Sequence, residues 1–295
     1  MMICSTEYKD KAAYRTSFNK LAGMVFGLDF EEWYQRGCWD ERYICHSIAE
    51  GGEIIANVSA SKLDLVVSGQ TRRAVQIGTV MTHPDHRGQG YAACLMQQVL
   101  DTYADTCDFV YLFANRSVLD FYPRFGFSPV KTTEYEMEAP AETGRSVISA
   151  KPDKLDITSA SGFGLLQQML AVSRPVSDRL GVVNNTGLFA FYAMSVFPGS
   201  LYYWAEQETV VVAGHEGETL HLYDVVSPAP VRLEKLLPAL CTGGTKKIRF
   251  HFTPDSLLDR AYPVESGDAG EVLFARPGRE LDAIAPVCYP KLAQA

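Results

Sequence analysis

The sequence lacks a long hydrophobic run and a block of positive charge. No stretch approaches the roughly 18–20 consecutive apolar residues that a membrane span needs, and residues 1–11 do not have the pattern of a signal peptide. Lys and Arg total 27 against 35 Asp and Glu, which gives a net charge of -8. A general nucleic-acid binder needs clustered positive charge to displace counterions. We therefore expect neither a membrane nor a nucleic-acid partner.

The cysteines also lack a pattern of pairs. There are seven of them, an odd number, and no two have the CxxC spacing. A disulfide framework or a zinc site is therefore not expected, and a reducing cytoplasm fits this cysteine usage. His83 and His86 lie three residues apart, but a metal site needs more ligands than these two. We predict no metal cofactor.

The chain is long enough for two domains. It has 295 residues, and domains typically contain roughly 100–200. Residues 138–149 carry few large apolar groups, and residues 151–156 are polar and contain a proline. We predict a first domain over 1–140, a linker over 141–156 and a second domain over 157–295.

Both halves mix helical and strand patterns, which predicts an α+β fold class. Strands in the first half are expected over 43–49, 54–65, 74–82, 109–113 and 129–137, and helices over 7–26 and 91–103. Strands in the second half are expected over 201–204, 209–213, 220–226, 248–252 and 272–275, and helices over 163–170 and 230–240. The second half thus repeats the order of elements found in the first, although its residues do not repeat.

Residues 75–96, VQIGTVMTHPDHRGQGYAACLM, join a strand to a helix through a glycine-rich loop. Glycine permits close backbone approach, and the free N–H groups and dipole of a helix's first turn attract anions. Arg87 adds a positive charge. The loop matches neither the GxxxxGK[ST] phosphate loop nor the full GxGxxG fingerprint. Taken alone, it fits a diphosphate site or a purely structural turn.

The same segment resembles motif A of the GCN5-related N-acetyltransferases (GNAT), whose core is [QR]-x-x-G-x-[GA]. Arg87, Gly90 and Ala92 occupy those positions. About 30 residues further on, YLFAN (111–115) is similar to the family's fifth strand and FYPRFGF (121–127) to its FYxRxGF segment. Two motifs in the right order make the resemblance specific, and it covers about residues 5–137.

The resemblance implies a central mixed sheet that splays open, with acetyl-CoA bound between its fourth and fifth strands. Tyr122 stands where many members have a tyrosine that protonates the departing CoA thiolate. The fourth strand would pair with the pantetheine arm, the loop would hold the pyrophosphate, and Asn115 would lie near the arm. The residues implied to bind the cofactor are Val80, Met81, Thr82, Arg87, Gly88, Gln89, Gly90, Tyr91, Ala92 and Asn115.

The acceptor site is predicted from residues 30–34, FEEWY, which follow the first helix where the family's acceptor site often begins. Glu32 could attract a cationic amine and Trp33 could offer a cation–π face. The same pattern is also typical of an amphipathic helix with a solvated acidic face. The general base stays open among Glu32, Glu53 and a water chain.

The second half resembles a degenerate copy of the same fold, because residues 224–232, DVVSPAPVR, lack RxxGxA. This tandem arrangement is similar to that of the enhanced-intracellular-survival acetyltransferases, without their sterol-carrier-like third domain. In those proteins the terminal carboxylate serves in the active site. We do not expect Ala295 to reach the active site here.

We therefore expect an acetyl-CoA-dependent N-acetyltransferase that acts on a small-molecule primary amine by direct attack in a ternary complex. Two alternatives stay open: a non-catalytic acyl-CoA-binding or regulatory protein, and an acetyltransferase of a protein or peptide amine. The acceptor, the acyl chain and the oligomeric state are also open, with a homo-oligomer among the alternatives.

Overall fold

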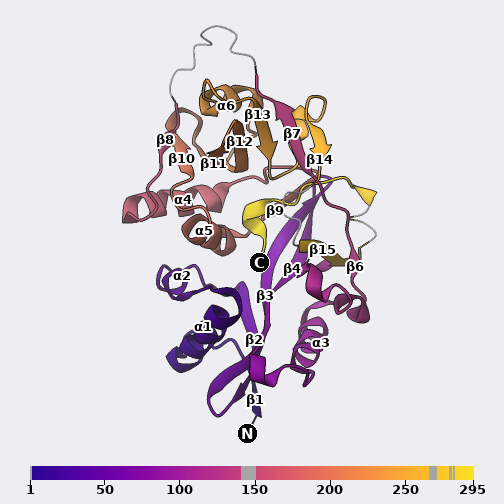
Figure 1. Cartoon of the computed structure of the whole chain (residues 1–295). Coiled ribbons are helices and arrows are strands. Elements are labelled where there is room, and N and C mark those ends of the chain that lie inside the picture. Colours follow the sequence, from indigo (N-terminus) through magenta and orange to yellow (C-terminus); the bar gives the residue numbers. More distant parts are fainter. Residues whose placement is uncertain (1, 141–150, 266–270, 279–280, 282) are drawn as a thin grey trace.

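The computed structural model describes residues 2–140, 151–265, 271–278, 281 and 283–295. Ten residues of the predicted linker, 141–150, lie outside this range. The described residues form two mixed sheets with helices on their faces (Figure 1). The mixed α and β architecture that the sequence predicts is therefore confirmed. No helix among the described residues has the length and apolar character to cross a bilayer.

The first sheet has a long antiparallel meander at its centre. Its strands are β1 (Met2–Thr6), β2 (Tyr43–Glu50), β3 (Glu53–Val67), β4 (Gln70–Thr82), β5 (Phe109–Asn115), β6 (Ser128–Pro129), β9 (Leu180–Val183) and β15 (Glu271–Arg276). Their spatial order is β1-β2-β3-β4-β5-β15-β6, with β9 paired to β3. Gly51 and Gly52, both with positive φ, form the tight turn between β2 and β3.

The second sheet repeats this order strand for strand. Its strands are β7 (Glu134–Glu138), β8 (Asp153–Lys154), β10 (Leu201–Trp204), β11 (Thr209–Glu216), β12 (Thr219–Val226), β13 (Lys247–Phe250) and β14 (Tyr262–Val264). Their order is β8-β10-β11-β12-β13-β7-β14. In each sheet an antiparallel meander leads through a crossover helix to a parallel strand, which then pairs with an antiparallel one.

The sixth strand of each sheet comes from the other half of the chain. β15 pairs with β5 in the first sheet, whereas β7 pairs with β13 in the second. The strand predicted over 129–137 is instead two strands in different sheets, β6 and β7. β6 ends at Pro129, and the Val130 N–H then donates one further hydrogen bond to the Leu273 carbonyl oxygen of β15 at 2.8 Å. The predicted division into 1–140 and 157–295 stays a prediction, and strand pairing crosses it in both directions.

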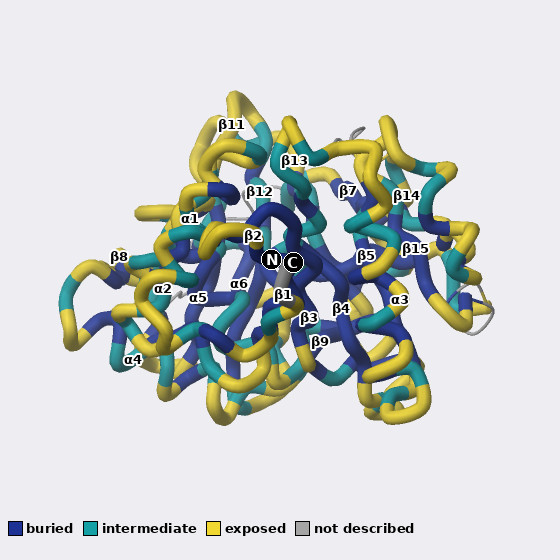
Figure 2. Tube along the Cα trace, turned by 90° about the horizontal axis from the view of Figure 1, so that it is seen from below, coloured by how far each residue is buried: buried dark blue, intermediate teal, exposed yellow. Residues whose placement is uncertain are grey.

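Helices pack against both sheets. They are α1 (Ala12–Phe26), α2 (Glu31–Gln35), α3 (Tyr91–Tyr103), α4 (Ala160–Val172), α5 (Thr186–Ser195) and α6 (Leu233–Leu240). α3 packs its apolar side against one face, and α1, α2 and α5 share a core on the other. The C-terminus lies at the middle of the molecule in Figure 1. Figure 2 shows the buried strands running through the centre, with exposed residues on the peripheral turns.

Candidate functional site

β4 and β5 pair over only part of their length. The parallel register joins Ala74 to Phe109 and ends where Ile77 meets Leu112. Both strands continue, but each then follows its outer neighbour: β4 pairs with β3 as far as Thr82, and β5 pairs with β15 as far as Asn115. The two strands are therefore not hydrogen-bonded to each other over residues 78–82 and 113–115, and we call this region between them the slot.

β4 also bulges at the mouth of this slot. Asn57 of β3 faces Met81, whereas Ser59 faces Gly78, so Thr79 and Val80 together occupy one position of the ladder. Thr79 has a φ of 48°, a left-handed conformation that is rare for a β-branched residue. Bulges of this kind re-aim backbone groups and are frequent beside active sites.

The glycine-rich loop lies at the end of β4. A 3-10 turn, η1 (Pro84–His86), is followed by Arg87, whose Nε donates to the Thr82 carbonyl oxygen at 3.4 Å. Gly88 and Gly90 have φ of 75° and 82°, so the turn requires glycine at both positions. α3 begins at Tyr91, and its first N–H groups have no partner within the helix. An exposed turn with these donors and one cation suits a diphosphate.

Tyr122 lies in a second 3-10 turn, η3 (Tyr122–Phe125), after β5. The residue is 5% exposed, and its ring packs against Phe121, Phe127 and Phe274. Burial raises the pKa of the phenol to about 12, and the Glu271 carboxylate acts in the same direction. The side chain is therefore a neutral phenol at physiological pH, the state that can donate a proton.

Asn115 ends β5 and also caps the 3-10 turn η2 (Arg116–Val118). Its Oδ1 accepts hydrogen bonds from the Ser117 N–H at 3.0 Å and from the Ser117 hydroxyl at 2.9 Å. The predicted strand positions Val80, Met81 and Thr82 line the slot through their main chain. Met81 is buried, and the other two are half-buried.

The predicted acceptor residues have structural partners. Trp33 is 4% exposed, stacks among aromatic rings that include Trp39 and Phe191, and donates its Nε1–H to the Gly187 carbonyl oxygen at 2.6 Å. Glu32 is exposed and pairs with Arg36 at 3.0 Å. A contact of Glu32 or Trp33 with the acceptor stays a prediction. Glu53, also considered as a base, pairs with Lys20 at 2.9 Å.

Ala295 reaches the slot, so the expectation that it stays away is wrong. A Cβ on Gly78 would lie 2.8 Å from the Ala295 carbonyl carbon. The buried Gln76 amide donates to the Ala293 carbonyl oxygen at 2.7 Å and accepts a hydrogen bond from the Ala295 N–H. The one sequence signal was a glycine inside a strand, which often marks close approach of another backbone.

Two tyrosines that sequence analysis did not single out complete the hydrogen-bond network through which Gln76 holds the C-terminal segment. The Tyr111 and Tyr289 hydroxyls lie 2.6 Å apart, and the Gln76 Nε2 donates to both. Tyr289 also donates to the Ala293 carbonyl oxygen at 2.9 Å. Tyr289 lies 178 positions from Tyr111 and 213 from Gln76, so no local pattern could have revealed these two contacts.

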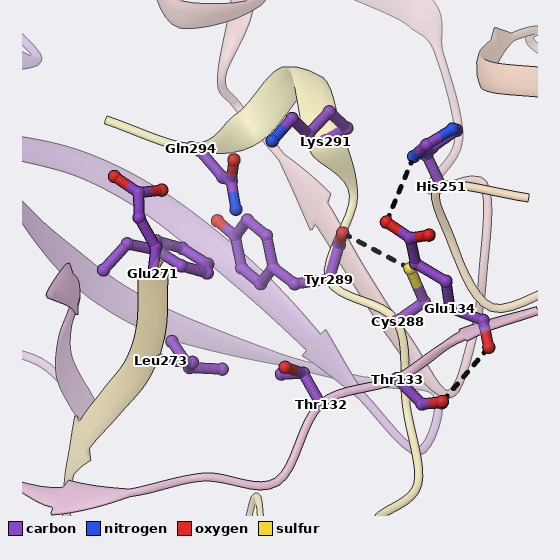
Figure 3. A pocket seen from close by; sticks show the side chains of 11 residues that line it. Thr132, Thr133, Glu134, His251, Glu271, Leu273, Cys288, Tyr289, Lys291 and Gln294 are labelled. Carbon is purple, nitrogen blue, oxygen red and sulfur yellow. Dashed lines mark hydrogen bonds and ion pairs between the residues drawn. The ribbon is translucent and has the colours of Figure 1, made fainter. Parts of the chain in front are cut away.

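A pocket opens beside the C-terminal segment, between the two sheets (Figure 3). Phe113 at the end of the slot and Gln294 next to Ala295 are among its lining residues. Glu134 and His251 also line it, with the Glu134 carboxylate 3.6 Å from the His251 Nδ1. No group of three or more His, Cys, Asp or Glu side chains in the described part of the chain is arranged to hold a metal ion.

Comparisons with known proteins agree with this geometry. Residues 11–130 match the family described as an acetyltransferase (GNAT) domain. The chain is similar to the GCN5-related N-acetyltransferase from Kribbella flavida, with 16% identity, 96% of this chain and 73% of that chain covered, and a TM-score of 0.58. No curated protein matches the sequence.

Two further solved structures share the fold. Eis1 from Mycobacterium abscessus is 17% identical, with 92% of this chain and 73% of that chain covered and a TM-score of 0.60. A GCN5-related N-acetyltransferase from Anabaena variabilis is 13% identical, with 93% and 72% covered and a TM-score of 0.57. The shared fold thus extends over both sheets. Residues 11–130 therefore match a GNAT acetyltransferase domain, and the remainder of the chain shares the fold of the solved tandem structures.

Proposed function

We propose that this acyltransferase moves an acetyl group from acetyl-CoA to a primary amine by direct attack in a ternary complex. The observation that carries the proposal is the slot between β4 and β5, which opens after Ile77 and Leu112 although both strands continue. Its main-chain groups can pair with the amides of a pantetheine arm, and the glycine-rich turn lies at its end.

In this proposal, different residues bind the pyrophosphate, bind the pantetheine arm and transfer the proton. The turn over Arg87–Ala92 holds the pyrophosphate through N–H groups and the Arg87 cation. Main-chain groups of Val80–Thr82 hold the pantetheine arm, and the Val80 N–H polarises the thioester carbonyl. Tyr122 gives its proton to the departing thiolate, and the amine nitrogen forms the new bond to the acetyl carbon.

The acceptor enters, in this proposal, through the pocket of Figure 3, which adjoins the slot at Phe113 and Gln294. In a chain that ends at Ala295, the α-carboxylate stands above Gly78 and can take a proton from the incoming ammonium. That position favours the carboxylate over Glu32 and Glu53, which are exposed and paired with cations. The cytoplasmic location predicted from the cysteines stays part of the proposal.

The test is release of free CoA thiol from acetyl-CoA with a panel of polyamines, aminoglycosides and amino-acid amines. Wild-type protein should release thiol in an amine-dependent way. Tyr122→Phe should lower kcat by about 100-fold, because general acid catalysis typically contributes 10²–10⁴. The affinity for CoA, measured by calorimetry, should change little.

Tyr135→Phe is the matched control for this variant. Tyr135 is a buried tyrosine of the second sheet, and its hydroxyl donates to the Pro286 carbonyl oxygen at 2.8 Å. The control should keep wild-type kcat although it also loses a buried hydroxyl. Saturable acetyl-CoA binding without turnover on any amine or peptide would instead favour a binding protein.

A further inference from the structure

The bulge in β4 holds a conformation that its own residue type disfavours. Thr79 combines a branched Cβ with a φ of 48°, so the surrounding structure must impose this backbone. The β3 register passes from Ser59–Gly78 to Asn57–Met81, and the β5 register ends at Ile77. Thr79 and Val80 therefore lie outside both ladders at the point where the slot opens.

Asn57 is the side chain that fixes this bulge. Its residue is 0% exposed, and its Nδ2 donates to the Thr79 carbonyl oxygen at 2.9 Å and to the Ser59 hydroxyl at 2.9 Å. Its Oδ1 accepts from the Ser47 hydroxyl at 2.8 Å, which sets the orientation of the amide. Tyr43 contacts the same bulge, with its hydroxyl 2.7 Å from the Thr79 Oγ1.

We propose that Asn57 is a positioning residue for acyl transfer. The Thr79 carbonyl and the Val80 N–H belong to one trans peptide unit, so holding the carbonyl toward Asn57 points the Val80 N–H the opposite way, toward the thioester carbonyl. Asn57 does not touch acetyl-CoA itself and acts only through the bulge. This inference rests on the proposed function, because it assigns a task to the N–H that the transfer step uses.

The test compares Asn57→Leu with wild type. Leu has a similar size but no hydrogen-bond donor, so the Thr79 carbonyl oxygen in the bulge loses its hydrogen bond from residue 57. We expect kcat to fall by about 10- to 100-fold while the KM for acetyl-CoA stays within about threefold, because the pyrophosphate turn is untouched. A purely structural role predicts instead a lower melting temperature with unchanged kcat per folded molecule, and that result overturns the proposal.

Two further variants separate positioning from loss of stability. Ser47→Ala removes the bond that orients the Asn57 amide but keeps the Nδ2 donor to Thr79, and should lower kcat by clearly less than Asn57→Leu does. In an Asn57→Leu background, Thr79→Gly should recover at least fivefold of kcat, because glycine takes a φ of 48° without strain. An equal loss of kcat in Ser47→Ala, or no recovery with glycine, contradicts the inference.

A binding measurement distinguishes this inference from the proposed function. Acetyl-CoA labelled with ¹³C at the thioester carbonyl should show a lowered carbonyl stretch when bound to wild type. Asn57→Leu should bind the labelled acetyl-CoA but lose this shift, whether or not any amine turns over. If wild type binds acetyl-CoA with no shift, the inference fails while the proposed function stands. If acetyl-CoA does not bind, both fail.

Discussion

Asp224 is a buried carboxyl group with no cationic partner among the residues that the structure describes. It lies in β12, and burial raises its pKa to about 7, against the opposing effect of its hydrogen bond from the Val225 N–H at 2.7 Å. The native state therefore keeps a proton between pH 4 and 7 that the unfolded chain releases. The free energy of unfolding falls as pH rises through this window, and the loss is complete above it.

Asp224→Asn should remove this pH dependence. We expect the variant to melt roughly 5 °C higher than wild type at pH 8, and the two to converge below pH 4, where the carboxyl is neutral in both states. Scanning calorimetry at several pH values measures the difference. The exposed Asp105→Asn is the control, and a gain of the same size there would show that net charge, not burial, is responsible.

Single residues differ in how far the sequence reveals them. Arg87, Gly90 and Tyr122 were found because each belongs to a short motif whose order along the chain carries meaning. Asn57 and Gln76 act through partners that the fold brings together, and an amide inside a strand has no local signature. Trp33 is the opposite case. Its sequence context suggested a face open to a ligand, whereas its side chain is packed among aromatic rings.

At the scale of elements, α3 is the one the sequence predicts best, with both ends at the expected residues. Its buried face, Leu95 to Leu100, has strict helical spacing. The first helix begins at Ala12 rather than at residue 7, because Glu7 has a φ of 51° and Tyr8 turns its ring into the core. α5 was missed because it buries apolar residues on most sides and shows no stripe.

The turn before α3 makes a prediction of its own. Gly90→Ala should weaken CoA binding about 10-fold and lower the melting temperature by roughly 3 °C, because a side chain at a φ of 82° costs about 1 kcal/mol and shifts the N–H groups. Apart from its chain neighbours, no described residue has an atom within 4 Å of the new Cβ, so the main effect is backbone strain. Calorimetric titration with CoA measures the affinity.

Gly69→Ala is the matched control for the turn. Gly69 has a φ of 75°, also has open space where an added Cβ would lie, and is in the turn between β3 and β4. The same backbone strain there should lower the melting temperature by about as much as in Gly90→Ala, but leave the affinity for CoA unchanged. Weakened binding in both variants would show that general destabilisation, rather than the shape of the turn, sets the affinity.

At the scale of the whole molecule, each half of the chain supplies one strand to the sheet of the other half: β7 to the second sheet and β15 to the first. Neither half is therefore expected to fold without the other. A fragment of residues 1–140 carries β7 without its sheet and lacks β15, whose Leu273, Phe274 and Ala275 are buried. We expect this fragment to show no cooperative thermal unfolding and no CoA binding. A folded, CoA-binding fragment would contradict the prediction.

The control for the fragment is the full chain cut at an engineered protease site between residues 140 and 151. This cut breaks the backbone but keeps every strand, so the two pieces should remain together and unfold in one transition. Size-exclusion chromatography and calorimetry compare it with the fragment. The exchange escaped sequence prediction because β7 and β15 look like ordinary last strands of their own halves.

The position of β15 also affects how the protein is made. The ribosome releases β5 more than 150 residues before it releases β15. At roughly 5–20 residues per second, β5 waits on the order of 10–30 s for its neighbour. Throughout that interval the growing chain presents an open edge to chaperones and to neighbouring nascent chains on the same messenger. We therefore expect the order of the strands, rather than the composition, to govern how far the nascent chain binds chaperones.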